Sequence, residues 1–143
     1  MKIREVMTEK VEFLAPETTL QEAAVRMREL GCGFLAVDDG KAEKLIGVVT
    51  DRDLVIRATA EGLDPRTSQI GDLVTDRVLY CFADDDLEMA SGSMREQGVY
   101  RLIVLDNPDS KKLCGVISLG DILRHGETKL AASTAEAITS KAA

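Results

Sequence analysis

Apolar and polar positions follow the same order twice along the chain. In each half, a short apolar run is followed by turn residues and then by a stretch in which apolar residues recur every three or four positions. Such spacing predicts an amphipathic helix in each half. The stripe and its repeat consist of Leu20, Ala23, Ala24, Met27 and Leu30, and of Leu87, Ala90 and Met94. Gly31 and Gly98 stand where the ends of these helices are expected.

Strands are expected on both sides of each helix. A short apolar run precedes each helix and two more follow it, which predicts strands at residues 11–14, 34–38 and 45–50 and at residues 78–82, 101–105 and 113–118. Another helix begins near Asp51 and near Leu119, and short helical turns are expected at residues 3–7 and 70–74. Each half is therefore a βαββα unit of the mixed α/β class.

The two halves align in one register. Residues 3–8 match residues 70–75, an offset of 70 − 3 = 67, and the offset becomes 115 − 47 = 68 from Gly47 onward. An offset held through each half indicates an internal repeat. We therefore predict two domains, residues 1–66 and 67–125, followed by a terminal helix or disordered tail at 126–143. One such unit buries little core alone, so the two are expected to pack with pseudo-two-fold symmetry.

Each repeat closes with the same short motif. Residues 47–53 read Gly-Val-Val-Thr-Asp-Arg-Asp, and residues 115–121 read Gly-Val-Ile-Ser-Leu-Gly-Asp. A hydroxyl residue three positions before an acid is the pattern of a capping box, which is a structural feature of helix starts. The same geometry also suits a ligand, because a helix N-terminus with a hydroxyl attracts phosphate and a carboxylate can accept both hydroxyls of a ribose. Both interpretations stay open at this point.

In the ligand interpretation, the hydroxyls of Thr50 and Ser118 contact phosphate and the carboxylates of Asp53 and Asp121 hold ribose. We expect both acids to be surface positions, so that replacing them leaves the fold intact.

The two repeats resemble CBS (cystathionine β-synthase) domains, and together they resemble the tandem pair called a Bateman module. The resemblance covers residues 3 to about 125 and rests on the leading Val-Met-Thr, the helix stripe, the middle strand and the closing motif, in order and twice. It implies a homodimer, and it implies AMP, ADP, ATP or S-adenosylmethionine bound in clefts between the repeats. Thr50, Asp53, Ser118 and Asp121 are then the first candidate contacts, with the adenine near Val11 and Val78.

The repeats differ at the start of their middle strands, which makes the two sites unequal. Tyr100 and Arg101 stand there in the second repeat, whereas Gly33 and Phe34 stand in the first. Arg grips phosphate with paired hydrogen bonds, so Arg101 is a candidate phosphate contact and Tyr100 a candidate lining residue. The alternative is a surface Arg101 that pairs with a nearby acid.

Composition narrows the function classes. The 143 residues carry a net charge of −7, which disfavours nucleic acid and anionic membranes as partners. The short apolar runs and the absence of a signal core indicate a cytoplasmic protein. Cys32, Cys81 and Cys114 are widely spaced, so we expect buried thiols and no metal site.

We also find no pairing of nucleophile and base, and so we expect no catalytic residues and no required cofactor. The prediction is a ligand-sensing module that acts on a regulated partner protein. The alternative is a structural or interaction pair that binds no nucleotide.

Overall fold

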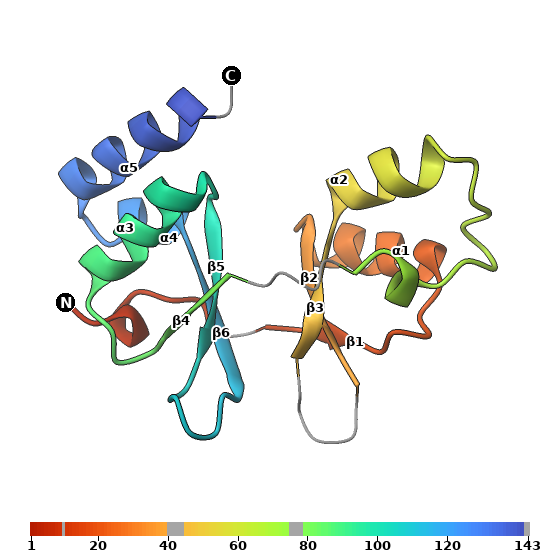
Figure 1. Ribbon diagram of the computed structural model, residues 1–143, viewed down its shortest axis with the longest axis horizontal. Coiled ribbons are helices and arrows are strands. Elements are labelled where there is room, and N and C mark those ends of the chain that lie inside the picture. The colour runs from red at the N-terminus through yellow and green to blue at the C-terminus, as the bar shows by residue number, and fades with distance from the viewer. Residues whose placement is uncertain (10, 40–44, 75–78, 142–143) are drawn as a thin grey trace. The chain divides into compact units, whose positions relative to one another are not determined.

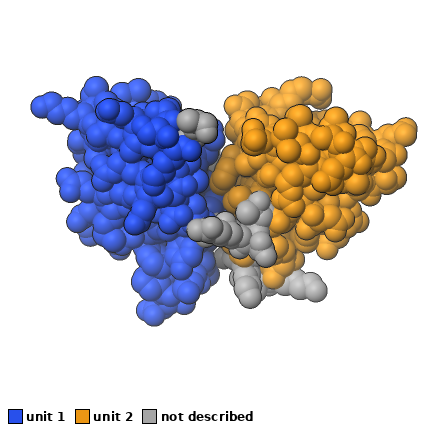
Figure 2. Space-filling view, turned by 45° about the horizontal axis from the view of Figure 1, so that its top comes forward, with its two compact units in different colours: residues 1–11, 79–143 blue, residues 12–78 orange. Residues whose placement is uncertain are grey.

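The computed structural model describes residues 1–9, 11–39, 45–74 and 79–141. The chain forms two compact units, which Figure 2 shows in different colours. Unit 1 contains residues 1–11 and 79–143, and unit 2 contains residues 12–78. Val78, where the first strand of the second repeat was predicted to begin, lies outside the described residues.

Unit 2 holds most of the first repeat as a three-stranded sheet with helices on one face (Figure 1). Its elements are β1 (Phe13–Leu14), α1 (Leu20–Leu30), β2 (Phe34–Asp38), β3 (Leu45–Thr50), α2 (Asp51–Asp53), a π-helical stretch (Leu54–Thr59) and a 3-10 turn (Ile70–Asp72). The central strand β2 runs parallel to β1 and antiparallel to β3. The predicted βαββα order is confirmed.

Unit 1 repeats this arrangement and adds a helix. Its elements are a 3-10 turn (Ile3–Glu5), β4 (Tyr80–Phe82), α3 (Leu87–Gln97), β5 (Arg101–Leu105), β6 (Leu113–Ser118), α4 (Leu119–Arg124) and α5 (Thr128–Lys141). The central strand β5 again runs parallel to one neighbour, β4, and antiparallel to the other, β6. The C-terminal segment was expected to be either a helix or a disordered tail, and α5 shows that it is a helix.

Each repeat begins with a turn that packs on the other repeat. The amide of Ile3 donates to the carbonyl of Asp85 at 3.0 Å, and the amide of Ile70 donates to the carbonyl of Thr18 at 2.8 Å. Both isoleucine side chains are fully buried. The boundaries of the compact units therefore differ from those of the sequence repeats. The first residues of each repeat belong to the compact unit that the other repeat forms.

Glycine at position 115 lets the N-terminal segment come close to β6. The amide of Thr8 donates to the carbonyl of Val116 at 2.9 Å, and the amide of Val116 donates back at 3.0 Å. A Cβ atom at Gly115 would lie 2.8 Å from both the sulfur of Met7 and the carbonyl oxygen of Thr8. Only glycine fits this approach without displacing the segment.

Local signals explain where the two long helices begin and end. Thr19 caps α1 with its hydroxyl, which accepts from the amide of Glu22 at 3.2 Å, while the Glu22 carboxylate accepts from the Thr19 amide at 3.0 Å. Gly31 and Gly98 end α1 and α3 in the left-handed conformation, with φ of 65° and 68°. The helix ends expected at these glycines are confirmed.

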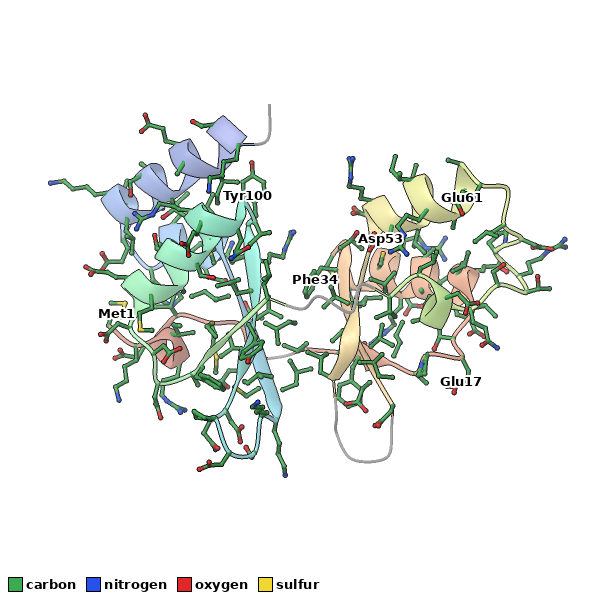
Figure 3. The ribbon with its side chains drawn as sticks, in the orientation of Figure 1. Met1, Glu17, Phe34, Asp53, Glu61 and Tyr100 are labelled. Carbon is green, nitrogen blue, oxygen red and sulfur yellow. The ribbon has the colours of Figure 1, made fainter. Side chains whose placement is uncertain are left out.

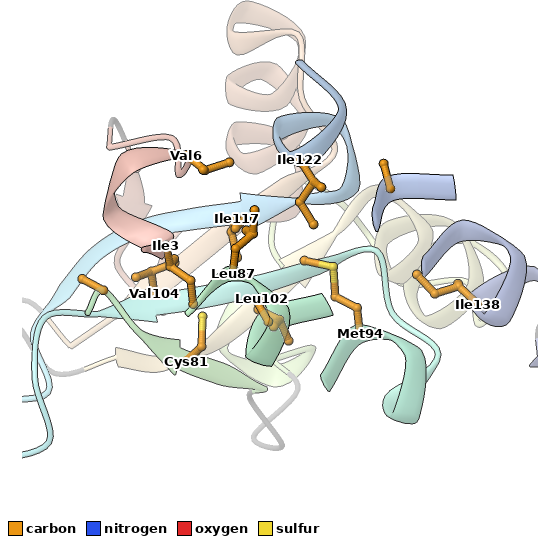
Figure 4. Packing of buried hydrophobic residues seen from close by; sticks show 13 residues of the cluster. Ile3, Val6, Cys81, Leu87, Met94, Leu102, Val104, Ile117, Ile122 and Ile138 are labelled. Atoms are coloured by element: carbon orange, nitrogen blue, oxygen red, sulfur yellow. The ribbon is translucent and has the colours of Figure 1, made fainter. Parts of the chain in front are cut away.

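α5 packs against α3 and α4 and completes the core of unit 1 (Figure 4). Ile138 of α5 joins Met94 of α3 and Ile122 of α4 in one cluster, and all three are fully buried. The hydroxyls of Ser91 and Thr134 hydrogen bond at 2.5 Å between α3 and α5. This bond satisfies two polar groups that would otherwise be buried at a cost.

Candidate functional site

The closing motif of each repeat forms a complete capping box. In unit 2, the amide and the hydroxyl of Thr50 donate to Asp53 Oδ2 at 2.9 and 3.0 Å, and the Asp53 amide donates to the Thr50 hydroxyl at 3.1 Å. In unit 1, Ser118 and Asp121 make the same three bonds at 2.9, 2.9 and 3.2 Å. The structural interpretation of the motif is confirmed. Because each hydroxyl already donates to its own acid, it cannot donate to a phosphate while the box is closed.

The other carboxylate oxygen distinguishes the two motifs. Asp121 Oδ1 accepts from the hydroxyl of Thr8 at 3.2 Å and from Arg124 Nη2 at 2.5 Å. A carboxylate has about four acceptor positions, and with the two bonds from Ser118 those of Asp121 are filled. Asp121 is only 4% exposed, so the expectation of a surface position is wrong for this residue. The N-terminal segment, through Thr8, is part of what covers it.

Asp53 keeps one carboxylate oxygen available, and Figure 3 labels this residue in α2, the short helix that follows β3. Within the described ranges, the contact of Asp53 Oδ1 is with Arg57 Nη1 at 3.9 Å, which is too long for a hydrogen bond. The Asp53 side chain is 17% exposed, so it is partly shielded from water yet reachable. Asp53 can therefore accept two further hydroxyl groups without losing its capping contacts.

The start of α2 is unsuited to a phosphate. The amide of Asp51 donates to the carbonyl of Gly33 at 2.9 Å, and the amide of Arg52 donates to Asp51 Oδ1 at 2.8 Å. The first amides of the helix are therefore already bonded. Gly33 accommodates the Asp51 carboxylate, since a Cβ atom there would lie 2.3 Å from Asp51 Oδ2. Two carboxylates at this end, Asp51 and Asp53, repel an anion.

The equivalent position in unit 1 is more cationic. Arg101 on β5 lies directly across from Ser118 on β6, where unit 2 has Phe34 across from Thr50. Arg101 is exposed, and its guanidinium has no hydrogen bond or ion pair with the residues that the structure describes. Leu119 and Gly120 stand where unit 2 has Asp51 and Arg52. The alternative of an Arg101 paired with a surface acid finds no support among the described contacts.

The structure gathers the candidate residues into two groups. Tyr100, Arg101, Ser118 and Asp121 lie at one end of the β5–β6 pair, where the Tyr100 carbonyl accepts from the Leu119 amide at 3.0 Å. Tyr100 is exposed, and its role as a lining residue stays a prediction. Thr50 and Asp53 lie at the corresponding end of β3 in unit 2.

The two candidates for the adenine are not joined to these groups by any described contact. Val11 is half-buried, and its amide donates to the carbonyl of Glu9 at 3.0 Å. Val78 lies outside the described residues. Sequence reasoning missed Thr8 and Arg124 as partners of Asp121. Thr8 could have been recognised because a threonine recurs at the equivalent position 75. Arg124 could have been recognised because it follows Asp121 by one helical turn, a spacing at which side chains on a helix meet.

Burial disfavours the thiolate form of two cysteines, Cys81 and Cys114. Burial raises the pKa of the Cys81 thiol to about 12 and also raises the pKa of Cys114. Both are therefore protonated at neutral pH, whereas metal binding and nucleophilic attack need the thiolate. Cys32 is exposed, so the expectation of a buried thiol is wrong there. Among the described side chains, no group of three or more His, Cys, Asp or Glu residues is arranged to hold a metal ion. Within the same ranges, no helix is long and apolar enough to span a membrane.

Comparison with known proteins agrees with this architecture. The family model for the CBS domain matches residues 3–58 and 70–127. Hypoxic response protein 1 of Mycobacterium tuberculosis is 35% identical over 122 residues, which are 85% of this chain and 82% of that protein.

Two solved structures extend the likeness to three dimensions. A crystal structure of hypoxic response protein I with two coordinated zinc ions matches with a TM-score of 0.76 and 33% identity, over 87% of this chain and 98% of that chain. The CBS domain pair of protein MJ0100, in complex with 5′-methylthioadenosine and S-adenosyl-L-methionine, has a TM-score of 0.76 at 19% identity, over 90% and 98% of the two chains. The second likeness shows the fold alone.

Proposed function

Because the chain belongs to the CBS domain family and carries two CBS domains in tandem, we propose that this regulatory module senses an adenine nucleotide or S-adenosylmethionine and is not an enzyme. The observation that carries the proposal is Asp53, a partly shielded carboxylate with one oxygen free of hydrogen bonds to the described residues. The ligands crystallised with the distant MJ0100 pair both contain an adenosyl group, which has a ribose diol.

Asp53 suits the ribose. Its Oδ2 is held by Thr50, which fixes the direction of Oδ1, and a carboxylate that accepts hydroxyl donors forms charge-assisted bonds. Such bonds contribute about 1.5–3 kcal/mol each when the groups are desolvated. Asp121 needs to release Thr8 or Arg124 before it can accept a ligand hydroxyl. We therefore assign the ribose to Asp53 and a structural role to Asp121.

A panel of ligands tests this function by thermal unfolding. AMP, ADP, ATP, S-adenosylmethionine and adenosine are each added at increasing concentration, with GMP as a control of similar charge. A ligand that binds only the folded protein raises the unfolding temperature by mass action. We expect at least one adenosyl ligand to do so with saturable dependence on concentration. An unchanged unfolding temperature for every adenosyl ligand up to millimolar concentration contradicts the proposal.

We propose Arg101 as a phosphate contact separately from the ribose site at Asp53, because its exposed guanidinium has no hydrogen bond to the described residues; the prediction concerns the total affinity for AMP and assigns no shared site. Arg101→Gln is expected to weaken AMP binding by about ten- to a hundred-fold, because the change removes a charge-assisted pair of bonds. Adenosine, which lacks the phosphate, should bind the variant and the original protein equally. Titration calorimetry measures both affinities, and raising the salt concentration should weaken AMP binding more in the original protein than in the variant.

Arg66→Gln is the matched control, because Arg66 is an exposed arginine in a loop of unit 2 that pairs with Asp64. It should leave both ligands unaffected. Equal losses of adenosine and AMP affinity in Arg101→Gln would show that Arg101 supports the fold or the base rather than a phosphate.

A module that binds a partner protein without any nucleotide is the second candidate. One observation favours it: both capping boxes are complete without a ligand, and Asp121 is saturated by its own chain. The ligand panel separates the two candidates, because only a ligand-sensing module is stabilised by an adenosyl compound.

We further propose that the module acts as a homodimer on a regulated partner protein. Large apolar side chains remain exposed on the helices, including Val55 and Leu123. Exposed apolar surface of this kind commonly marks a contact with another chain. Light scattering at micromolar concentration should give twice the mass of the 15.5 kDa chain, and a monomeric mass contradicts the homodimer.

A further inference from the structure

A groove of about 690 Å³ runs between α3 and α5 on the surface of unit 1. The two helices lie side by side (Figure 1), and Lys141 Nζ of α5 donates to the carbonyl of Glu96 at the end of α3 at 2.7 Å. The second family match ends at residue 127, and α5 begins at Thr128. In the described part of unit 2, no helix takes the place of α5. One wall of the groove is therefore a helix that lies outside the CBS repeat.

Small and apolar residues line the middle of the groove. Met89 of α3 is 60% exposed, Gly92 follows it one helical turn later, and Ala137 contributes from α5. The first repeat has Glu22 where the second has Met89 (89 − 67 = 22), and it has Val25 where the second has Gly92 (92 − 67 = 25). The second repeat thus carries an apolar side chain in place of an acid and a gap in place of a side chain.

Gly92 is not required by the packing of its own chain. It lies in the interior of α3, and its backbone is not left-handed. Apart from its chain neighbours and the helix backbone, a Cβ atom there would meet within 4 Å a single described atom, Arg95 Nη2, at an ordinary contact distance of 3.8 Å. Glycine in a helix interior is less stable than alanine, because it loses more backbone freedom on folding. A close approach by another molecule accounts for a glycine at this place.

The groove also carries an unpaired cation. Arg95 is half-buried, and its guanidinium, which lies beside Gly92, has no hydrogen bond or ion pair with the residues that the structure describes. Arg95 and Lys141 against Glu96 leave the lining with one excess positive charge, whereas the whole chain has a net charge of −7. The groove therefore favours an acidic group beside an apolar one.

We propose that the groove between α3 and α5 docks an amphipathic, acidic helix of another protein. A large apolar side chain of that helix lies over Gly92, against Met89 and Ala137, and one of its acids pairs with Arg95. Two parallel walls made of helices suit a third helix, whose ridge of side chains fits between them. The glycine allows the third helix to come close, as a knob enters a hole. The inference rests on the proposed regulated partner protein and gives it a docking place, and it is independent of the proposed ligand.

A synthetic helical peptide tests the groove with the full chain, in the absence of any adenosyl compound. The labelled peptide spans about four helical turns, with leucines along one face and glutamates beside them. Fluorescence anisotropy should show saturable binding, and a peptide with lysines in place of the glutamates should bind about tenfold more weakly or worse. Arg95→Gln should reduce the difference between the two peptides, whereas Arg28→Gln, its repeat equivalent on α1, should not.

Gly92→Leu places a side chain in the groove and should weaken binding of the acidic peptide by about tenfold or more. Val25→Leu is the matched control at the equivalent position of the first repeat, and it should leave binding unchanged. Gly92→Ala tests the glycine itself. It should raise the unfolding temperature of the free protein by about 2–6 °C, because the helix gains a better helix former at no cost in packing. Circular dichroism verifies that each variant is folded.

Several outcomes would overturn the docking site. They are equal binding of the two peptides, no saturable binding at millimolar peptide, and acidic-peptide binding that Gly92→Leu leaves unchanged. A lower unfolding temperature in Gly92→Ala would show that the glycine serves the fold. A changed mass of Gly92→Leu in sedimentation equilibrium would assign the groove to a contact between copies of this chain instead. None of these outcomes alters the thermal test with adenosyl ligands, which can fail or succeed separately.

Discussion

Asp53→Ala is expected to weaken adenosine and AMP binding by about ten- to a hundred-fold, the equivalent of losing one or two charge-assisted hydrogen bonds. Of the two motif acids, Asp53 keeps an oxygen without a hydrogen bond to the described residues, whereas both oxygens of Asp121 are bonded. The variant also loses the acid of its capping box, which costs about 1 kcal/mol of stability. The fold should survive, and titration calorimetry at a temperature well below unfolding measures the change in affinity.

Asp51→Ala is the control for this prediction. Asp51 is a neighbouring carboxylate whose Oδ1 accepts from the Arg52 amide and whose side chain lies on Gly33. Losing it removes negative charge from the same helix start without touching the proposed ribose contact. Equal loss of adenosine affinity in both variants would show a general charge effect, and no loss in either would remove Asp53 from the site.

Asp121→Ala is expected to destabilise the protein by about 3 kcal/mol, whereas Asp53→Ala costs about 1 kcal/mol. The buried Asp121 carboxylate accepts from the amide and hydroxyl of Ser118, from Thr8 and from Arg124. Its removal leaves those donors without an acceptor and also detaches the N-terminal segment from α4. Urea unfolding followed by circular dichroism measures both free energies of unfolding.

Thr8→Val tests whether the N-terminal segment contributes to this difference. The substitution removes the donor to Asp121 Oδ1 but keeps the shape of the side chain, and it should cost about 1 kcal/mol. Combined with Asp121→Ala, its further cost should be near zero, because the shared bond is already lost. Identical free energies of unfolding for Asp53→Ala and Asp121→Ala would contradict the distinction between the two acids.

The repeat made most of the secondary structure predictable. Four predicted strands have the observed bounds: residues 34–38, 45–50, 101–105 and 113–118. They were predictable because the same apolar pattern occurs in both repeats, so each copy supports the assignment made for the other. The exchange of the leading turns was not predictable. Ile3 and Ile70 are the same residue at equivalent positions, and so either pairing buries the same apolar surface.

The sequence predicted the two hydroxyl–acid motifs but not the difference between their acids, Asp53 and Asp121. The spacing of hydroxyl and acid identified both capping boxes correctly. Which acid keeps a free oxygen depends on Thr8, which is 113 residues from Asp121 in the sequence. The C-terminal segment was ambiguous for a similar reason. Its Ala, Ser and Thr residues have no strong helical stripe, and its helix depends on packing through Thr134 and Ile138 against α3 and α4.

The most direct measurement of the central claim is a titration of the isotope-labelled chain with adenosine, followed by amide NMR shifts. We expect saturable shifts at the amides of Thr50, Asp53 and Leu54, with much smaller changes at Ser118 and Asp121. The same titration of Asp53→Ala should need at least tenfold more adenosine for half-saturation. Saturable shifts centred on Ser118 and Asp121, or no shifts at millimolar adenosine, would contradict a ribose site at Asp53.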